Sequence, residues 1–297
     1  MIPEFYMNML KEQYSDSDIK KIIDGYSKKR KTTIRVNTLL SNNSEVLDIF
    51  NKLNIEYDHV PFYDNAFIIK NRNEIDLYEL DLLKEGKIYM QSLSSMLPPI
   101  IMEPKEYEDI LDMAAAPGGK TTEIAALTNN NSKITAVEFN KIRAEKLRYN
   151  IKKQGCSKVY VLEADSKKLD DFFKFDNILL DAPCSGSGTL DLNNDRTFKY
   201  FTEKLIKKSS ETQFELLKKA LTILKPGKTM IYSTCSILSI ENEDVVSKVM
   251  KQFNCEIVPI NVEGVELLPT KIEGTMVVCP NELYEGFYIA KIKKKEV

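Results

Sequence analysis

The sequence contains a single histidine, no tryptophan and only five cysteines among 297 residues. A Ser-His-Asp triad would have to use His59, which lies in YDHVPFY, a segment predicted to run from a strand into a turn. A structural role is the simpler interpretation of that histidine. The cysteines form no C-x-x-C pair and have no histidines to join them, so we expect no metal site.

Long apolar runs and an excess of either charge are also lacking. No stretch approaches 18 consecutive apolar residues, and the start MIPEFYMNML has neither the basic flank nor the cleavage site of a secretory signal. The 42 basic and 44 acidic side chains nearly balance, which excludes a highly charged disordered chain. We therefore expect a soluble, cytoplasmic protein, monomeric and without a membrane segment.

Residues 1–88 predict a small α+β domain. A helix is expected over residues 15–26, because Ser15 can cap it and its apolar side chains share one face. Strand, helix, strand and strand are then expected over residues 33–39, 46–53, 55–60 and 66–70.

Residues 89–297 show a regular alternation of short apolar runs with helical segments. The runs cover residues 109–113, 134–138, 159–165, 177–183 and 229–235, and residues 255–260 and 286–293 add two strands at an edge. Such alternation predicts right-handed crossovers and a parallel, doubly wound α/β sheet. Ligands of these sheets bind at the carboxyl ends of the strands, where the polar motifs of this sequence lie.

The segment DMAAAPGGKTT, residues 112–122, follows the first of these strands and opens a helix. Small residues there let a ligand approach backbone amides at a helix amino terminus. The segment is close to the phosphate-binding pattern G-x-x-x-x-G-K-[ST], but Ala114 replaces the first glycine and Pro117 removes a donor. A P-loop-like ATPase is therefore one alternative, and NILLD, ending at Asp181, has the shape of its second motif.

Two acids favour a nucleoside instead. Glu138 ends the second strand about twenty residues after the glycines, where an acid binds ribose hydroxyls in nucleoside-binding sheets. Asp165 ends the third strand, where it can accept from an adenine amino group. Each acid has a simpler alternative as a helix or turn cap. The loop and both acids together predict a nucleoside site without polyphosphate, and S-adenosylmethionine is such a ligand.

Two cysteines stand apart from the other three. Cys184 in DAPCSGSG (181–188) and Cys235 in STCS (233–236) lie in small polar loops after neighbouring predicted strands. The remaining cysteines are predicted to be ordinary core residues: Cys156, Cys255 and Cys279.

At these residues the sequence resembles the NOL/NOP/SUN family of S-adenosylmethionine-dependent RNA cytosine-5 methyltransferases. The resemblance extends over TIRVNTL (33–39), YMQSLSSMLP (89–98), DMAAAPGGKTT, Glu138, DAPCSGSG, LKPG (224–227) and STCSILSIENEDVV (233–246). It implies a Rossmann-like class I methyltransferase domain over residues 89–297, with a mostly parallel seven-stranded sheet and helices on both faces. Residues 1–88 would form an α+β RNA-binding domain.

The chemistry of this family gives a reason for the presence of two cysteines at the site. A thiolate that adds to carbon 6 of cytosine makes carbon 5 nucleophilic enough to attack a sulfonium methyl group. The resemblance implies that Cys235 is the nucleophile and that Cys184 helps to release the product. Asp181 would contact the cytosine edge or an amino group, and Lys120 would orient the cofactor carboxylate or approach the base.

The resemblance also implies a cofactor site. Its residues are Ala114, Ala115, Ala116, Pro117, Gly118, Gly119 and Lys120 at the methionine end, Glu138 at the ribose, Asp165 at the adenine, and Arg143 and Asp181 beside the cofactor. One departure is visible, because the family commonly has Gln-Asp where this sequence has Gln91 followed by Ser92.

Positive charge is concentrated near the amino terminus. The residues expected to contact RNA phosphates are Lys20, Lys21, Lys28, Lys29, Arg30, Lys31 and Arg35. The basic helix over residues 141–153 is interpreted as a solvated face.

We therefore expect 5-methylcytosine formation in RNA. A tRNA substrate is favoured because the sequence lacks the long extensions of many ribosomal-RNA members of the family. Ribosomal RNA is the alternative substrate. An ATPase and a non-catalytic RNA-binding protein are the alternatives from other classes.

Overall fold

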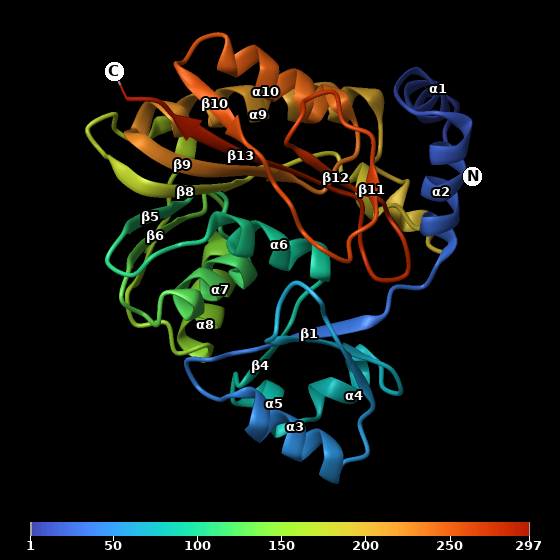
Figure 1. Cartoon of the computed structure of the whole chain (residues 1–297), viewed down its shortest axis with the longest axis vertical. Coiled ribbons are helices and arrows are strands. Elements are labelled where there is room, and N and C mark those ends of the chain that lie inside the picture. Colours follow the sequence, from blue (N-terminus) through green and yellow to red (C-terminus); the bar gives the residue numbers. More distant parts are fainter. Residues whose placement is uncertain (1, 297) are drawn as a thin grey trace.

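The protein, seen in a computed structural model that describes residues 2–296, contains two sheets with their helices (Figure 1). The smaller sheet is antiparallel, in the order β2-β3-β1-β4. Its strands are β1 (Thr32–Val36), β2 (Tyr57–His59), β3 (Ala66–Ile69) and β4 (Ile88–Met90). Three helices accompany this sheet: α3 (Asn43–Lys52), α4 (Glu74–Tyr78) and α5 (Asp81–Lys84). The expected small α+β unit is confirmed, whereas β4, α4 and α5 were not predicted.

The larger sheet has the order β11-β12-β13-β9-β8-β5-β6-β7, with β10 beside β13. Its parallel strands are β5 (Asp109–Asp112), β6 (Lys133–Val137), β7 (Val159–Leu162), β8 (Phe175–Asp181) and β9 (Leu224–Thr234). The antiparallel strands are β10 (Cys255–Val258), β11 (Leu267–Leu268), β12 (Met276–Val278) and β13 (Phe287–Lys294). The fold class is confirmed, but the sheet has nine strands rather than seven, because β11 and β12 are too short to show a pattern.

Helices cover both faces of the larger sheet (Figure 1). One face carries α6 (Leu93–Met102), α7 (Gly119–Leu127) and α8 (Lys141–Lys153), and the other carries α9 (Glu203–Ile223) and α10 (Glu243–Met250). Side chains of β8 alternate between the two cores: Ile178 and Leu180 enter one, and Leu179 enters the other. Across residues 2–296, no helix is both long and apolar enough to span a membrane.

The first two helices, α1 (Glu4–Gln13) and α2 (Asp16–Ser27), belong to the core of the larger sheet. Tyr6 and Tyr26 are buried there, and the Tyr26 hydroxyl donates to the carbonyl of Ser187 at 2.6 Å. Figure 1 shows both helices beside β11 and β12, away from the smaller sheet. The helix predicted over 15–26 is confirmed, with Ser15 as its cap. The domain division proposed at residue 88 falls inside β4. The helix α2 precedes this division in the sequence but packs in the core of the larger sheet.

A buried polar cluster joins the two sheets. Arg35 of β1 is fully buried and donates to Gln91 Oε1 and to Thr122 Oγ1, each at 3.1 Å. Its Nε lies 4.0 Å from a carboxylate oxygen of Glu123, which also accepts from Gln91 Nε2 at 2.7 Å. Burial raises the pKa of Glu123 to about 8. The expectation that Arg35 contacts RNA is therefore wrong, because its guanidinium is enclosed between β1 and α7.

We predict that Gly25→Ala destabilises the protein although alanine favours helices. In a helix interior alanine is better than glycine by about 0.5–1 kcal/mol. A Cβ at position 25, however, would overlap the carbonyl oxygen of Pro280, and overpacking costs about 1–3 kcal/mol. The midpoint of urea denaturation should therefore fall. Lys20→Ala, at an exposed position of α2, is the control and should leave it unchanged. A raised midpoint for Gly25→Ala would contradict this packing.

Candidate active site

The loop between β5 and α7 begins the site. Its residue Gly118 has a φ of 109°, and a Cβ there would lie 2.9 Å from the Leu147 side chain, so only glycine fits. Asp112, at the end of β5, accepts from Thr121 Oγ1 at 2.6 Å and anchors the loop to α7. Burial raises the pKa of Asp112 to about 6. Sequence reasoning left Asp112 out of the site, although its place at a strand end was a signal.

A cavity of about 560 Å³ opens beside this loop. It is lined by Ala114 and Ala116 of the loop, Glu138 and Arg143, Asp165, and both Cys184 and Cys235. Glu138 is almost completely buried, accepts from the backbone N–H of Asn140 at 2.9 Å and lies 3.5 Å from Arg143 Nη1. Arg143 Nη2 donates to the carbonyl of Ala116 at 2.8 Å, so it ties the start of α8 to the loop. Glu138 thus accepts a local backbone hydrogen bond just before α8, whose cap is Asn140, and also presents a carboxylate to the cavity.

Asp165 combines the same two properties. It accepts from the backbone N–H of Lys167 at 3.0 Å and lines the cavity. Phe139, 71% exposed, lines the cavity next to Glu138 and was not predicted. One side of α9 also lines it, through Leu205, Lys208, Ser209, Thr212 and Leu216. No local motif pointed to that helix, because its contribution depends on how α9 packs over β8.

The two motif cysteines meet at the ends of β8 and β9. Cys184 Sγ lies 2.8 Å from Cys235 Sγ, and both are free thiols. The pKa of Cys184 is raised well above its usual range, mainly by the hydrogen bond to Cys235 and secondly by burial. Cys156 and Cys279 are buried and Cys255 is half-buried, which agrees with their prediction as packing residues.

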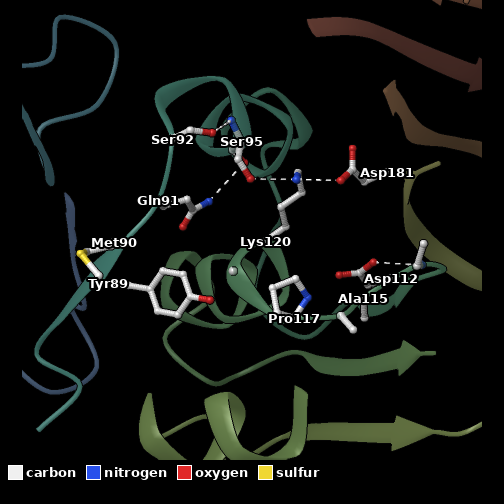
Figure 2. A pocket seen from close by; sticks show the side chains of 13 residues that line it. Tyr89, Met90, Gln91, Ser92, Ser95, Asp112, Ala115, Pro117, Lys120 and Asp181 are labelled. Carbon is white, nitrogen blue, oxygen red and sulfur yellow. Dashed lines mark hydrogen bonds and ion pairs between the residues drawn. The ribbon is translucent and has the colours of Figure 1, made fainter. Parts of the chain in front are cut away.

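Lys120 and Asp181 form an ion pair beside a second cavity of about 240 Å³ (Figure 2). Lys120 Nζ lies 2.7 Å from Asp181 Oδ2 and donates to Ser95 Oγ at 2.8 Å, and Ser233 Oγ donates to Asp181 Oδ1 at 2.8 Å. Burial by itself would lower the pKa of Lys120, but the Asp181 carboxylate outweighs it and the pKa is raised. Asp181 lines both cavities, so they meet at this carboxylate.

The remaining predicted loop residues lie around this second cavity. Its lining includes Ala114, Ala115, Ala116, Pro117, Gly119 and Lys120, together with Tyr89–Ser92 of the smaller domain's edge. Ser92, which stands where the family commonly has an acid, caps α6 and donates to Glu285 at 3.0 Å. The carboxylate of Glu285 thus lies within hydrogen-bond distance of residue 92.

A groove of about 470 Å³ continues from the second cavity between the two domains. Its basic lining residues are Arg30 and Lys31 and, from α8, Lys146 and Lys153, and Glu74 and Glu285 line it as well. The interpretation of α8 as a merely solvated face is incomplete, because two of its lysines face this groove. Of the other predicted RNA contacts, Lys20, Lys21, Lys28 and Lys29 are exposed; Lys21 pairs with Glu266, and Lys28 pairs with Asp24.

His59 lies away from this site, exposed on β2 and in contact with the rings of Tyr57 and Phe67. Among residues 2–296 there is no group of three or more His, Cys, Asp or Glu side chains arranged to hold a metal ion.

Comparison with known proteins gives a consistent picture. Ribosomal RNA small subunit methyltransferase F of Shewanella loihica is 32% identical over 303 residues, which cover 98% of this chain and 62% of that protein. The chain thus spans about three fifths of the length of the curated relatives it matches. A crystal structure of a methyltransferase homolog protein from Pyrococcus horikoshii has a TM-score of 0.83 at 31% identity, over 99% of this chain and 100% of that one. NSun6 from the same organism, solved with SFG, shares the fold with a TM-score of 0.87 at 23% identity, over 99% of both chains.

Two family models match. Residues 2–76 match the ferredoxin-like domain of RsmF/B-like methyltransferases, and residues 99–293 match the model described as 16S rRNA methyltransferase RsmB/F. Methyltransferases of this family use S-adenosylmethionine, so the predicted cofactor is confirmed. The chain belongs to the RsmB/F methyltransferase family, the NOL1/NOP2/SUN group whose motifs its sequence resembles.

Proposed function

We propose that this chain transfers a methyl group from S-adenosylmethionine to carbon 5 of a cytosine in RNA, through a covalent bond between Cys235 and carbon 6. The observation that carries the proposal is the approach of two free thiols to 2.8 Å in the cavity that Glu138 and Asp165 also line. Carboxylates suit a ribose and an adenine amino group, while neighbouring thiols suit addition to a pyrimidine ring.

The larger cavity fits the cofactor. Its buried Glu138 carboxylate matches the hydroxyl donors of a ribose, and Asp165 matches an amino donor at the other end. The exposed ring of Phe139 offers a flat apolar surface for the adenine. When bound, S-adenosylmethionine supplies an electrophilic methyl group. Ala114 and Ala116 have no bulky side chains, so the loop backbone can approach the methionine end.

The cytosine fits where the smaller cavity meets the larger one, beside Asp181 and within the reach of the thiols that line the larger cavity. Cytosine presents acceptors at ring nitrogen 3 and the carbonyl oxygen, and a donor at the amino group. Lys120 donates and Asp181 accepts at the point where the two cavities meet. This position supports the alternative in which Lys120 contacts the base rather than the cofactor carboxylate. A cationic donor there stabilises the negative charge that develops on the ring during thiolate addition.

The two thiols have different tasks in this proposal. The Cys235 thiolate forms a bond to carbon 6, the electrons of the 5,6 double bond move to carbon 5, and carbon 5 takes the methyl group. Carbon 5 then loses its proton to a base, the double bond re-forms and Cys235 departs as a thiolate. Cys184 holds its proton, because its pKa is raised, and donates a hydrogen bond to the departing sulfur.

The groove indicates how RNA reaches the site. Arg30, Lys31, Lys146 and Lys153 line the groove that continues into the smaller cavity, and cationic side chains bind phosphates without reading sequence. A target base must be turned out of its stack to enter a cavity of this size.

Substitution of the two cysteines separates their roles. Cys235→Ala should abolish methyl transfer while retaining S-adenosylmethionine and RNA binding, because only the nucleophile is lost. Cys184→Ala should accumulate an RNA–protein adduct on denaturing gels, because departure of Cys235 slows. Cys255→Ala, at a half-buried cysteine of β10, is the control and should methylate RNA normally. An adduct formed by Cys235→Ala, or none formed by Cys184→Ala, would contradict this division.

Removal of the proposed ribose contact should weaken the binding of S-adenosylmethionine. Hydrogen bonds to charged groups contribute about 1.5–3 kcal/mol, so Glu138→Ala should raise the Kd for S-adenosylmethionine by about 10- to 100-fold. Isothermal titration calorimetry measures this directly. Glu163→Ala changes an exposed acid after β7 that pairs with Arg148, and should leave the Kd unchanged. Equal affinities for the two variants would place the cofactor elsewhere.

The RNA substrate is decided by mapping. The proposed substrate is tRNA, and the names of the curated relatives make small-subunit ribosomal RNA the second candidate. Incubation with labelled S-adenosylmethionine and total RNA, followed by bisulfite mapping, should show new 5-methylcytosine in tRNA. Label confined to 16S rRNA would overturn the tRNA proposal, and label at another base would overturn cytosine-5 transfer itself.

A further inference from the structure

A buried carboxylate joins the loops that carry the two thiols. Glu241 lies in the short 3-10 helix Ser239–Glu241 after β9 and is fully buried. Its Oε1 accepts from the backbone N–H of Ser185 at 2.7 Å, and its Oε2 accepts from the Ser185 hydroxyl at 2.5 Å. The same Oε2 accepts from the Ser236 hydroxyl at 2.7 Å. Ser185 directly follows Cys184, and Ser236 directly follows Cys235, so one side chain holds the residue after each cysteine.

Neighbouring contacts hold Glu241 in turn. Gln213 of α9 contributes a longer hydrogen bond of 3.4 Å to Oε1, and the Tyr232 hydroxyl donates to the Glu241 carbonyl at 2.6 Å. Asn242 accepts from Thr234 Oγ1 at 2.6 Å and donates to the Ser236 carbonyl at 2.9 Å. Both flanks of Cys235 are thereby fixed to the segment that carries Glu241. A carboxylate enclosed by this many donors has little freedom to move.

We propose that Glu241 is a positioning residue that holds the Cys184 and Cys235 loops as one unit. The proposal rests on the function proposed above only for its catalytic consequence. The geometric part concerns the thiols alone, so it can be tested without RNA or cofactor.

The surrounding charges support the assignment of the proton. The hydrogen bond to Cys235, burial and the negative charges of Cys235 and Glu241 all raise the pKa of Cys184. On the cavity side the Lys120 ammonium interacts with Cys235 and is held by Asp181. The negative charge of Glu241 near Cys184 thus favours the neutral form of that thiol.

Glu241→Gln tests the proposal, because the amide keeps the size of the side chain and removes its charge. We expect kcat for RNA methylation to fall by about 10- to 100-fold, with KM for RNA and for S-adenosylmethionine changed less than about twofold, because a small misplacement of reacting groups acts on the chemical step. Glu243→Gln is the matched control. Glu243 is equally buried but accepts from Thr270 Oγ1 and the backbone of Lys271, remote from the cysteine loops.

A second measurement uses phenylarsine oxide, which bridges two adjacent thiols and releases water. In a background of Cys156→Ser, Cys255→Ser and Cys279→Ser, the unchanged Cys184–Cys235 pair should capture the probe rapidly. Glu241→Gln should slow the capture, and Ser185→Ala and Ser236→Ala should each slow it with effects that are not additive, because both act through one carboxylate. The serine variants keep the test valid if a Glu241 variant fails to fold.

The outcomes separate this inference from the proposed function. Normal capture and normal kcat for Glu241→Gln would overturn the inference, as would an equal loss of kcat for Glu243→Gln. Slow capture by Glu241→Gln in a protein whose wild type methylates no RNA would support the positioning role and overturn the proposed function.

Discussion

Parallel pairing of β8 with β9 is the interaction on which the site depends. Asp181 pairs with Ser233 at the last described position of the register, and the chain runs on from there to Cys184 and Cys235. Because the carboxyl ends of parallel strands meet at one edge, backbone hydrogen bonds bring together two thiols that are 51 positions apart in sequence. The pairing also sets Ser233 Oγ against Asp181. A shift of one residue would turn alternate side chains to the opposite face and separate these partners.

A second constraint fixes the small domain against this edge. A buried guanidinium is energetically costly unless it is paired. The partners of Arg35 are Gln91, which directly follows β4, and Thr122 and Glu123 of α7. Moving β1 away from α7 would leave the Arg35 guanidinium without these hydrogen-bond partners in a dry environment. Lys120 also belongs to α7. The contacts of Arg35 with α7 therefore fix the smaller sheet, and the part of the groove that it lines, relative to the Lys120–Asp181 pair.

Short sequence patterns predicted the features that depend on interactions between residues close together in the sequence. The cap at Ser15, the apolar strands and the two cysteine loops follow from short-range spacing, and the structure has them where expected. The helix α6 was not expected, because Pro98 and Pro99 lie inside it and proline normally ends helices. The burial of Arg35 could not be predicted either, because its partner Gln91 is 56 positions away and no residue near β1 indicates this contact.

Charge is unevenly distributed over this nearly neutral chain, which suits the RNA substrate proposed above. The formal net charge is −2, but at physiological salt a phosphate senses charges within about 8 Å and not the molecular total. Four basic side chains line the groove: Arg30, Lys31, Lys146 and Lys153. Glu74 and Glu285 also line the groove, so its lining carries four basic and two acidic side chains. The carboxylates that face the two cavities are partly neutralised: Asp181 by Lys120 at 2.7 Å, and Glu138 by Arg143 at 3.5 Å. A phosphate backbone in the groove would therefore meet an excess of positive charge, and pairing with Lys120 and Arg143 reduces the repulsion from the carboxylates of the inner cavities.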